Sequence, residues 1–203
     1  MTRNLARLSL ALALGWGLTA PAAAQIVVDD FNTGLYGVRR SSGIVSALQA
    51  GTMLGGTRST SLQIAYNPLG QLGTVIVGGG HLIVNQDTEV TSRVELFYGQ
   101  TASGLTPLDL DLTGYDRIRV YFRSNFQFLN FNILAFTSPV GYNQLGFNVA
   151  PAWGPFTQDF LFADFIDNGG NWGDTDYLWL IFQTWSPGGG DFAIDSVEVR
   201  AGP

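Results

Sequence analysis

Short apolar runs, broken every few residues by Gly, Asn, Asp or Pro, dominate the chain from Gln25 onward. Within several runs, apolar residues occupy alternate positions, a period of two that is typical of β-strands with one face toward a core. In 117–123, for example, Ile118, Val120 and Phe122 share one face. Hardly any stretch has helical spacing. The sequence therefore predicts an all-β fold with few or no helices, an antiparallel two-sheet β-sandwich.

The runs and the turn residues between them set the expected strands. We expect strands near 25–30, 35–40, 44–49, 59–66, 73–78, 81–86, 89–98, 117–124, 129–137, 143–148, 156–161, 177–185 and 191–199. Glycine triplets at 78–80 and 188–190 are interpreted as turns, because neither opens a helix whose N-terminal amides could bind a phosphate.

The N-terminus has the pattern of a cleaved secretory signal. Arg3 and Arg7 precede an apolar run over residues 8–18, and three alanines follow at 22–24. This order of charge, apolar segment and small residues predicts cleavage after residue 24. The run is shorter than the roughly 20 apolar residues of a membrane span. We therefore expect export to the periplasm or the extracellular space.

Removal of residues 1–24 leaves 25–203, a length that fits a single β-sandwich domain. This part holds eight Arg, no Lys and 16 acidic residues, a formal charge of −8. Such a charge repels phosphate backbones and anionic lipid, which argues against nucleic acid as a partner. No later stretch has membrane-spanning length, so we expect no membrane insertion of the mature chain. The absence of Cys excludes disulfides and thiol chemistry.

Several motifs carry a family resemblance. They are Val28-Asp29-Asp30-Phe31, the stretch 112–120, Asp191-Phe192-Ala193-Ile194-Asp195-Ser196-Val197, and Trp153 followed by Phe162-Ala163-Asp164-Phe165. Together they resemble the galactose-binding-like jelly-roll domains, which include several carbohydrate-binding modules. The start, combined with Leu54-Gly55-Gly56-Thr57-Arg58, is also similar to uncharacterised exported bacterial proteins that often carry a C-terminal sorting anchor, which is absent here.

The resemblance implies a jelly roll whose first and last strands are adjacent. It also implies a structural calcium ion near that junction, with Asp30 and Asp195 as candidate ligands. Relatives often have a second acidic residue after the position of Asp195, whereas Ser196 stands there in this chain.

Polar and aromatic residues at non-core strand positions form the best candidate binding site. Sugars present apolar CH faces and many hydroxyls, so a sugar site needs aromatic rings for stacking, and amides and Arg for paired hydrogen bonds. If their strands are neighbours in one sheet, the residues that supply these groups are Arg119, Tyr121, Asn130, Asn132, Trp179, Gln183 and Trp185. The alternative is that both tryptophans belong to the core and the polar groups pair across strands.

The loop 167–176 is a second candidate, because Asp, Asn and Gly at short spacing suit Ca²⁺, which takes about six to eight oxygen ligands. The same residues are common in ordinary turns. Trp172, in this loop, is expected at the rim of a binding groove. In the last strand, Phe192 and Ile194 have one parity and Val197 the other, which either a bulge near Asp195 or burial of both faces of the strand would explain.

Catalysis needs an acid/base pair or a nucleophile. His81 is the single histidine and has no recognisable partner motif. Glu95, Asp159 or Asp164 could serve a glycosidase, but the sequence places no two of them together. Three hypotheses follow: a secreted non-catalytic carbohydrate-binding protein whose partner is a polysaccharide, a structural or assembly protein of the envelope or matrix, and a glycoside-active enzyme.

Overall fold

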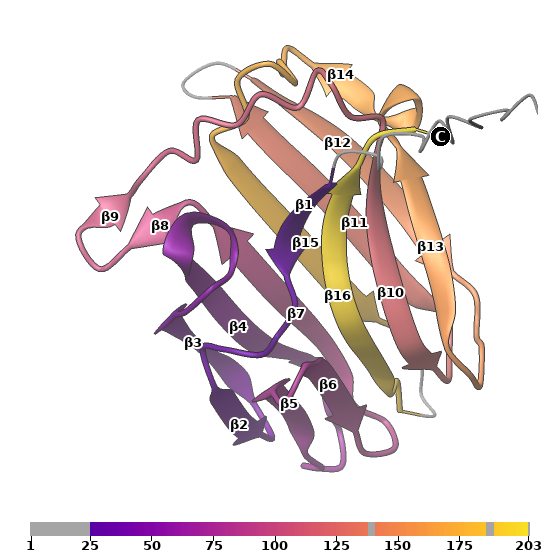
Figure 1. Ribbon diagram of the computed structural model, residues 1–203. Helices are drawn as coiled ribbons and strands as arrows, with labels where there is room; N and C mark the ends of the chain where they lie inside the picture. Colours follow the sequence, from indigo (N-terminus) through magenta and orange to yellow (C-terminus); the bar gives the residue numbers. More distant parts are fainter. Residues whose placement is uncertain (1–24, 138–140, 186–188, 203) are drawn as a thin grey trace, which may run out of the picture.

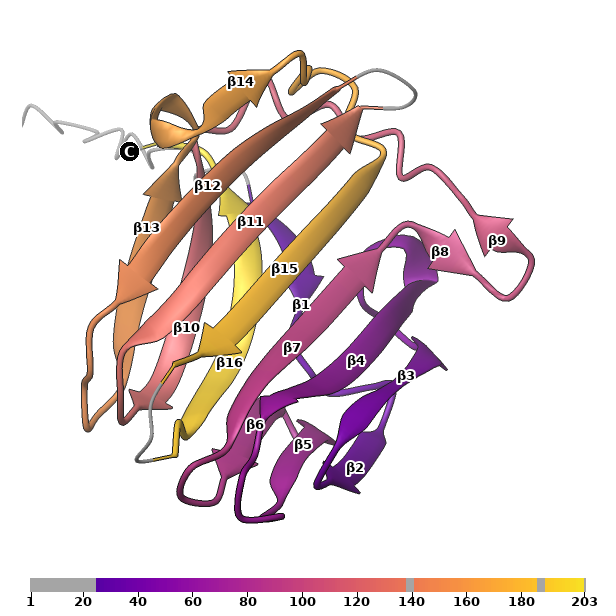
Figure 2. The ribbon, with the colours of Figure 1, turned by 180° about the vertical axis from the view of Figure 1, so that it is seen from behind.

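Two large antiparallel sheets pack face to face in a computed structural model that describes residues 25–137, 141–185 and 189–202. Figures 1 and 2 show the two sheets from opposite sides. The predicted signal segment, residues 1–24, lies outside the described residues. Among the described residues, no helix has the length and apolar character needed to cross a membrane.

The sheets are named A and B. Sheet A has the order β13 (Phe156–Leu161), β10 (Arg117–Asn125), β16 (Phe192–Arg200), β6 (His81–Gln86), β5 (Gly73–Gly78), β2 (Tyr36–Arg40), with β1 (Gln25–Asp29) paired to β16. Sheet B has the order β14 (Ile166–Asn168), β12 (Gly141–Val149), β11 (Leu129–Thr137), β15 (Tyr177–Thr184), β7 (Thr91–Tyr98), β4 (Thr57–Tyr66), β3 (Gly43–Ala50). A hairpin of β8 (Gln100–Thr101) and β9 (Gly104–Leu105) follows β7.

Alternation along the strands fills the space between the sheets with apolar side chains. On β15 of sheet B, Leu180 and Phe182 are fully buried, as are Ile118 and Val120 on β10 of sheet A. Phe131 stacks on Phe182 with ring centroids 4.4 Å apart. Burial of this apolar surface is the main favourable contribution to folding. The opposite side chains of the same strands therefore face outward.

The expected two-sheet antiparallel jelly-roll sandwich is confirmed. In the described part of the chain, helical structure is limited to two short 3₁₀ turns, Leu54–Gly56 and Phe162–Asp164. Three short strands, β8, β9 and β14, were not predicted, because two or three residues are too few to show alternation.

The predicted junction of the first and last strands is present, since β1 pairs with β16 and Ile26 lies opposite Val199. The predicted bulge is present as well. Tyr121 of β10 lies opposite Ser196 and the next residue, Phe122, lies opposite Ile194, so Asp195 has no partner in this ladder. The bulge reverses the parity of β16, which keeps apolar side chains inward on both sides of it.

A buried ion pair joins the sheets. Arg58 on β4 of sheet B is fully buried, and its Nη1 lies 2.5 Å from Oδ2 of Asp29 at the end of β1. Tyr98 on β7 donates from its hydroxyl to the same oxygen at 3.0 Å, and Arg58 Nη2 donates to the carbonyl of Gly34 at 2.7 Å. Burial raises the pKa of Asp29, and the Arg58 guanidinium beside it opposes that rise.

Loss of one partner of this pair should be strongly destabilising. We expect Asp29→Ala or Arg58→Met to lower the free energy of unfolding by about 3 to 5 kcal/mol, because each leaves a buried charge uncompensated. The double variant Asp29→Ala with Arg58→Met should cost less than the sum of the two single changes, because it leaves neither charge unpaired. Denaturant unfolding measures all three.

The matched control is Asp116→Asn, which removes the exposed partner of a part-buried pair with Arg117, and Arg117 keeps its second partner, Asp159. It should change the midpoint far less. Equal effects at Asp29 and Asp116 would contradict the structural role of the buried pair.

Candidate functional site

The outer face of sheet B holds three rows of side chains across its central strands. In the first row, Trp179 on β15 lies between Leu134 on β11 and Phe97 on β7, and Ser59 on β4 follows Phe97. Phe97 stacks on Tyr177 with centroids 5.9 Å apart and meets Trp179 edge-on at 6.3 Å. This row is the aromatic part of the face.

The second row is mostly polar. It runs from Asn132 on β11 through Ile181 on β15 to Glu95 on β7, then to Ser61 on β4 and Ser46 on β3. The carboxylate of Glu95 therefore lies in the middle of the face, beside the aromatic row.

The third row contains amides and a cation. Gln183 on β15 lies between Asn130 on β11 and Arg93 on β7. Arg93 pairs with Glu95, and its guanidinium carbon lies 5.7 Å from the centroid of the Trp179 ring. This cation–π contact places the guanidinium over the indole ring and holds the ring in position.

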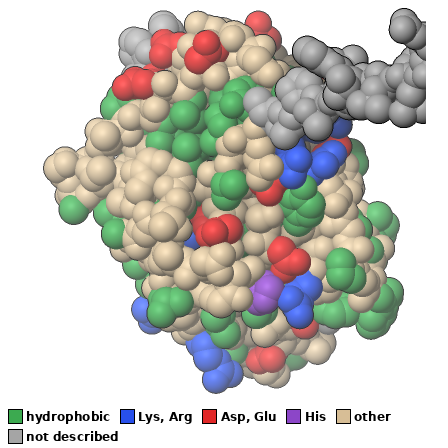
Figure 3. Space-filling model, viewed as in Figure 1, with side chains coloured by type: hydrophobic (Ala, Val, Ile, Leu, Met, Phe, Trp, Pro, Cys, Tyr) green, Lys and Arg blue, Asp and Glu red, His purple; other side chains and the backbone are tan. Residues whose placement is uncertain are grey.

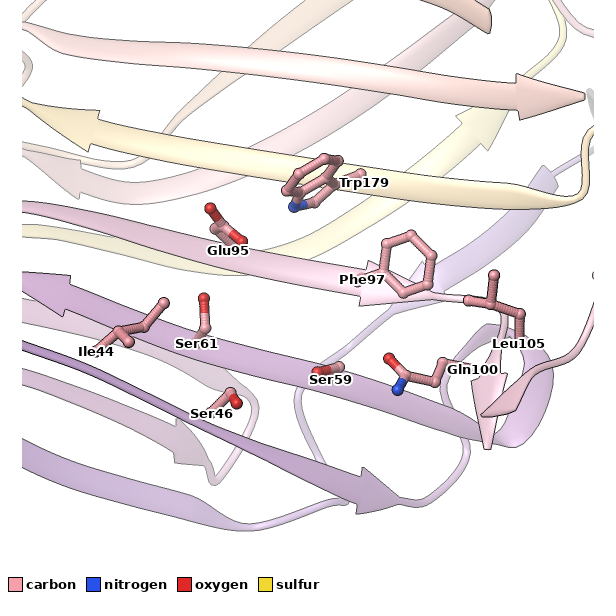
Figure 4. Close-up of a pocket in the computed structure, with 9 residues that line it drawn as sticks. All are labelled: Ile44, Ser46, Ser59, Ser61, Glu95, Phe97, Gln100, Leu105 and Trp179. Atoms are coloured by element: carbon pink, nitrogen blue, oxygen red, sulfur yellow. The ribbon is translucent and has the colours of Figure 1, made fainter. Parts of the chain in front are cut away.

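A pocket of about 360 Å³ opens where the first two rows meet the β8–β9 hairpin. Figure 4 shows its lining residues, which come from strands β3, β4, β7 and β15 and from the hairpin: Ile44, Ser46, Ser59, Ser61, Glu95, Phe97, Gln100, Leu105 and Trp179. We call it the Trp179 pocket.

Two polar atoms of the Trp179 pocket have no hydrogen-bond partner in the protein. Trp179 Nε1 and Ser61 Oγ are both buried from solvent, and Ser61 as a whole is only 8% exposed. In Figure 4 the indole nitrogen and the serine hydroxyl both turn toward Glu95. An unpaired buried polar group costs about 1 to 3 kcal/mol, so these atoms favour a ligand that supplies their missing hydrogen bonds.

A second pocket of about 470 Å³ lies at the other end of the face and is lined by Phe128, Asn130, Asn148 and Trp185. Phe128 and Trp185 are each 66% exposed. We call it the Trp185 pocket. Both pockets thus combine aromatic rings with polar side chains.

The amides near the Trp185 pocket orient one another. Asn132 Nδ2 donates to Asn130 Oδ1 at 2.7 Å, and Asn130 Nδ2 donates to Asn148 Oδ1 at 3.1 Å. Gly146 lies opposite Asn132, and a Cβ there would lie 2.9 Å from Asn132 Oδ1. The glycine therefore leaves room for the amide array.

Four predicted site residues share this face, namely Asn130, Asn132, Trp179 and Gln183, and Trp185 follows directly after β15. Phe97, Arg93, Ser61 and Asn148 were missed. Alternation in 91–98 already separates the parity of Arg93, Glu95 and Phe97 from that of the buried Val94 and Leu96, so part of this set could have been found.

The candidate site required all seven residues to lie in one sheet, and Arg119 and Tyr121 do not share a sheet with the others. Both lie on β10, which is in sheet A, on the opposite side of the sandwich. Arg119 donates from Nε and Nη2 to Asp159 at 2.6 and 2.7 Å, and the Tyr121 hydroxyl accepts from Arg200 at 2.9 Å. Alternation identifies the outer side of a strand but not the sheet that the strand joins.

Trp172 lies away from both pockets. Its ring stacks on Phe162 with centroids 3.9 Å apart, meets Phe165 edge-on at 5.2 Å, and packs against the core. It closes one end of the sandwich, so the structure does not place it at the groove rim that the sequence suggested.

The predicted calcium ligands Asp30 and Asp195 each have other partners. Asp195 Oδ1 lies 2.8 Å from His81 Nδ1 and 3.9 Å from Arg123 Nη1, and Asp30 Oδ1 accepts from the backbone of Asn32 at 3.1 Å. Figure 3 shows the single histidine between acidic and basic groups on the sheet A side. Because Asp195 lies beside a guanidinium, this donor set does not suit a divalent cation.

A different carboxylate cluster includes part of the predicted 167–176 loop. Asp174 and Asp176 meet Asp109, and the possible ligand atoms of the three all lie within 4.8 Å of one another. Backbone hydrogen bonds from Leu108 and Leu110 to this loop hold the segments together. The cluster has the oxygen donors that a hard cation prefers.

The structure does not bring together the carboxylates considered for glycoside chemistry. Glu95 lies on the outer face of sheet B and Asp159 on that of sheet A. Arg119 and Arg117 hold the pKa of Asp159 below its ordinary value, which does not suit a general acid. Asp164 lies in the 3₁₀ turn after β13.

No family model and no curated protein matches the chain. Similar solved structures include a family 11 carbohydrate-binding module from Clostridium thermocellum in complex with a β-1,3-1,4-mixed-linked tetrasaccharide, which is 15% identical with a TM-score of 0.45 over 89% of this chain and 97% of that chain. A mutant family 29 carbohydrate-binding module is 16% identical with a TM-score of 0.44 over 89% and 87% of the two chains.

A family 61 module in complex with β-1,4-galactotriose is 8% identical with a TM-score of 0.35 over 77% of this chain and 86% of that chain. These similarities are low in both sequence and structure. The residues of the site therefore carry the proposal that follows.

Proposed function

We propose that this chain binds carbohydrate on the outer face of sheet B, without catalysis. The observation that carries the proposal is the pair of unpartnered buried atoms, Trp179 Nε1 and Ser61 Oγ, in a pocket that also contains aromatic rings and a carboxylate. A sugar ring offers hydroxyls to the two unpartnered atoms and to the carboxylate, and it offers CH groups to the aromatic rings. An apolar ligand would leave both polar atoms unsatisfied.

The groups around Trp179 would make different contacts with a bound sugar. The indole and Phe97 present apolar ring surface to a pyranose CH face, and the Trp179 N–H donates to a sugar oxygen. The Glu95 carboxylate accepts from a hydroxyl, and Ser61 can donate or accept. Because Arg93 pairs with Glu95, the carboxylate is held in place before the ligand arrives.

The distance between the two pockets favours an extended ligand. Trp179 and Trp185 are separated by six residues of nearly continuous strand, roughly 20 Å at the usual rise. The amides Asn130, Asn132 and Gln183 lie on the face between them. We therefore favour an oligosaccharide or polysaccharide chain over a single sugar.

Calcium binding is proposed only at Asp109, Asp174 and Asp176. Three carboxylates this close repel one another, and a bound cation would relieve that repulsion. A bound ion would tie the segment before β10 to the loop before β15, away from the glycan face.

Export is also part of the proposal, and it rests on the signal-like pattern of residues 1–24. A polysaccharide partner is consistent with a protein that acts outside the cytoplasm.

Replacement of Trp179 separates stacking from hydrogen bonding. A glycan array identifies a ligand, and isothermal titration then measures its dissociation constant. We expect Trp179→Phe to weaken binding roughly three- to tenfold through loss of the N–H, and Trp179→Ala to weaken it further. The ligand should be recovered unhydrolysed.

Trp153→Ala is the control, because Trp153 is 82% exposed and lines a pocket with sheet A residues. It should leave binding unchanged, and all variants should keep the wild-type melting curve. Wild-type affinity in Trp179→Ala, or no retained glycan at all, would overturn the proposed site.

Calcium should raise the melting temperature of the wild-type protein, and a chelator should reverse the shift. The variant Asp109→Asn with Asp174→Asn should lose this response, because it removes two of the three charges. A melting temperature that ignores both calcium and chelator would remove calcium from the proposal. The glycan affinity of the same double variant is measured as a readout that does not depend on calcium.

Mass spectrometry of the protein from a bacterial host tests export. The fraction outside the cytoplasm should begin at Gln25, as expected for cleavage after residue 24. Retention of the uncleaved chain in the cytoplasm would contradict it.

A further inference from the structure

In the described part of the chain, the two large sheets have five edge strands, which differ in how well they are protected, and one of them, β1, has only five residues. In sheet A, β13 carries Asp159, and β2 carries Arg39 and Arg40. In sheet B, β14 has only three residues and pairs with residues 143–144 of β12, and the uncharged remainder of β12 is interrupted by Gly146, which weakens a strand. Charges and short length are common devices against pairing with another chain. The fifth edge, β3, has neither device, since it has eight residues and no charged side chain.

Strand β3 pairs with β4 along one side, and in the described part of the chain no strand pairs with its other side. On the outer face, Ile44 is 66% exposed and Leu48 is 38% exposed, with Ser46 between them. Val45 packs against the core on the inner side, which keeps the strand attached to the sandwich. Figure 2 shows β3 at the border of sheet B.

We propose that β3 pairs with β3 of a second copy of this chain. Free backbone groups at a sheet edge specify another strand as the partner. The sequence of β3 is self-complementary when two copies run antiparallel about a two-fold axis at Ser46. Ile44 then lies opposite Leu48 of the second copy on the outer face, and Val45 lies opposite Ala47.

Charge also favours this edge. The part of the chain from Gln25 onward carries a formal charge of −8, so two copies repel each other over most of their surface. An uncharged strand lets them approach without placing like charges opposite one another. One carbonyl, that of Ala47, accepts a hydrogen bond from Gln49 Nε2 and keeps a second lone pair for the ladder.

The dimer would join the two glycan faces. Ile44 and Ser46 line the Trp179 pocket, so this pocket lies beside the two-fold axis. Pairing would continue sheet B of one copy into sheet B of the other and place the two Trp179 pockets near each other. A ladder of one strand pair is smaller than a typical permanent interface, so the dimer should depend on concentration.

Sedimentation velocity over a concentration series, without glycan, tests the proposal on the full mature chain. The wild-type protein should shift from monomer to dimer as its concentration rises. Ile44→Lys with Leu48→Lys should remain monomeric, because the proposed register places lysines opposite one another. Ile44→Lys with Leu48→Glu should dimerise again, because each lysine then faces a glutamate.

Ile76→Lys on β5 of sheet A is the control, since Ile76 is also exposed but lies away from β3, and it should dimerise like the wild type. Melting curves verify that every variant folds. A wild-type monomer at all concentrations would overturn the proposal, as would a dimer that survives the two lysines. Failure of the lysine–glutamate variant to dimerise would overturn the antiparallel register.

Discussion

The buried contact between Asp29 and Arg58 is the constraint on which the arrangement of the two sheets depends. Asp29 ends the strand that pairs with β16, and Arg58 lies on β4 in the opposite sheet. A charge in the interior is tolerated only when its partner is held at hydrogen-bond distance, so the pair permits little change in how the sheets are placed. Ser59, the next residue after Arg58, belongs to the Trp179 pocket. The position of the pocket wall is thus tied to the core.

Most strands could be predicted because alternation and turn residues are local properties of the sequence. The adjacency of the first and last strands followed from the family resemblance, and the bulge at Asp195 from a change of parity. Sheet membership could not be obtained in this way. Arg119 and Asn130 are close in sequence and both face outward, yet their strands belong to different sheets. That choice depends on pairing between distant segments, which alternation does not encode.

In the candidate site, too, local properties could be predicted from the sequence and contacts between distant segments could not. Asn130, Asn132, Trp179 and Gln183 were identified because their residue types and parity suit sugar binding. The Trp179 pocket itself was not, since it requires β3, β4, β7, β15 and a hairpin of two-residue strands to converge. The meeting of Asp109 with Asp174 and Asp176 was missed for a similar reason, because it depends on a loop-to-loop contact between residues far apart in the sequence.

The period of two on β15 assigns folding and recognition to different residues of one strand. Leu178, Leu180 and Phe182 are buried between the sheets, while Trp179 and Gln183 face the other way. Substitution at the outward positions alters the surface that is available to ligands and has little effect on the packing of the core. Such a strand can diversify in ligand preference over evolution while its inward residues remain under selection for stability. Homologous chains with different outward residues would then share this scaffold and differ in the ligands that they bind.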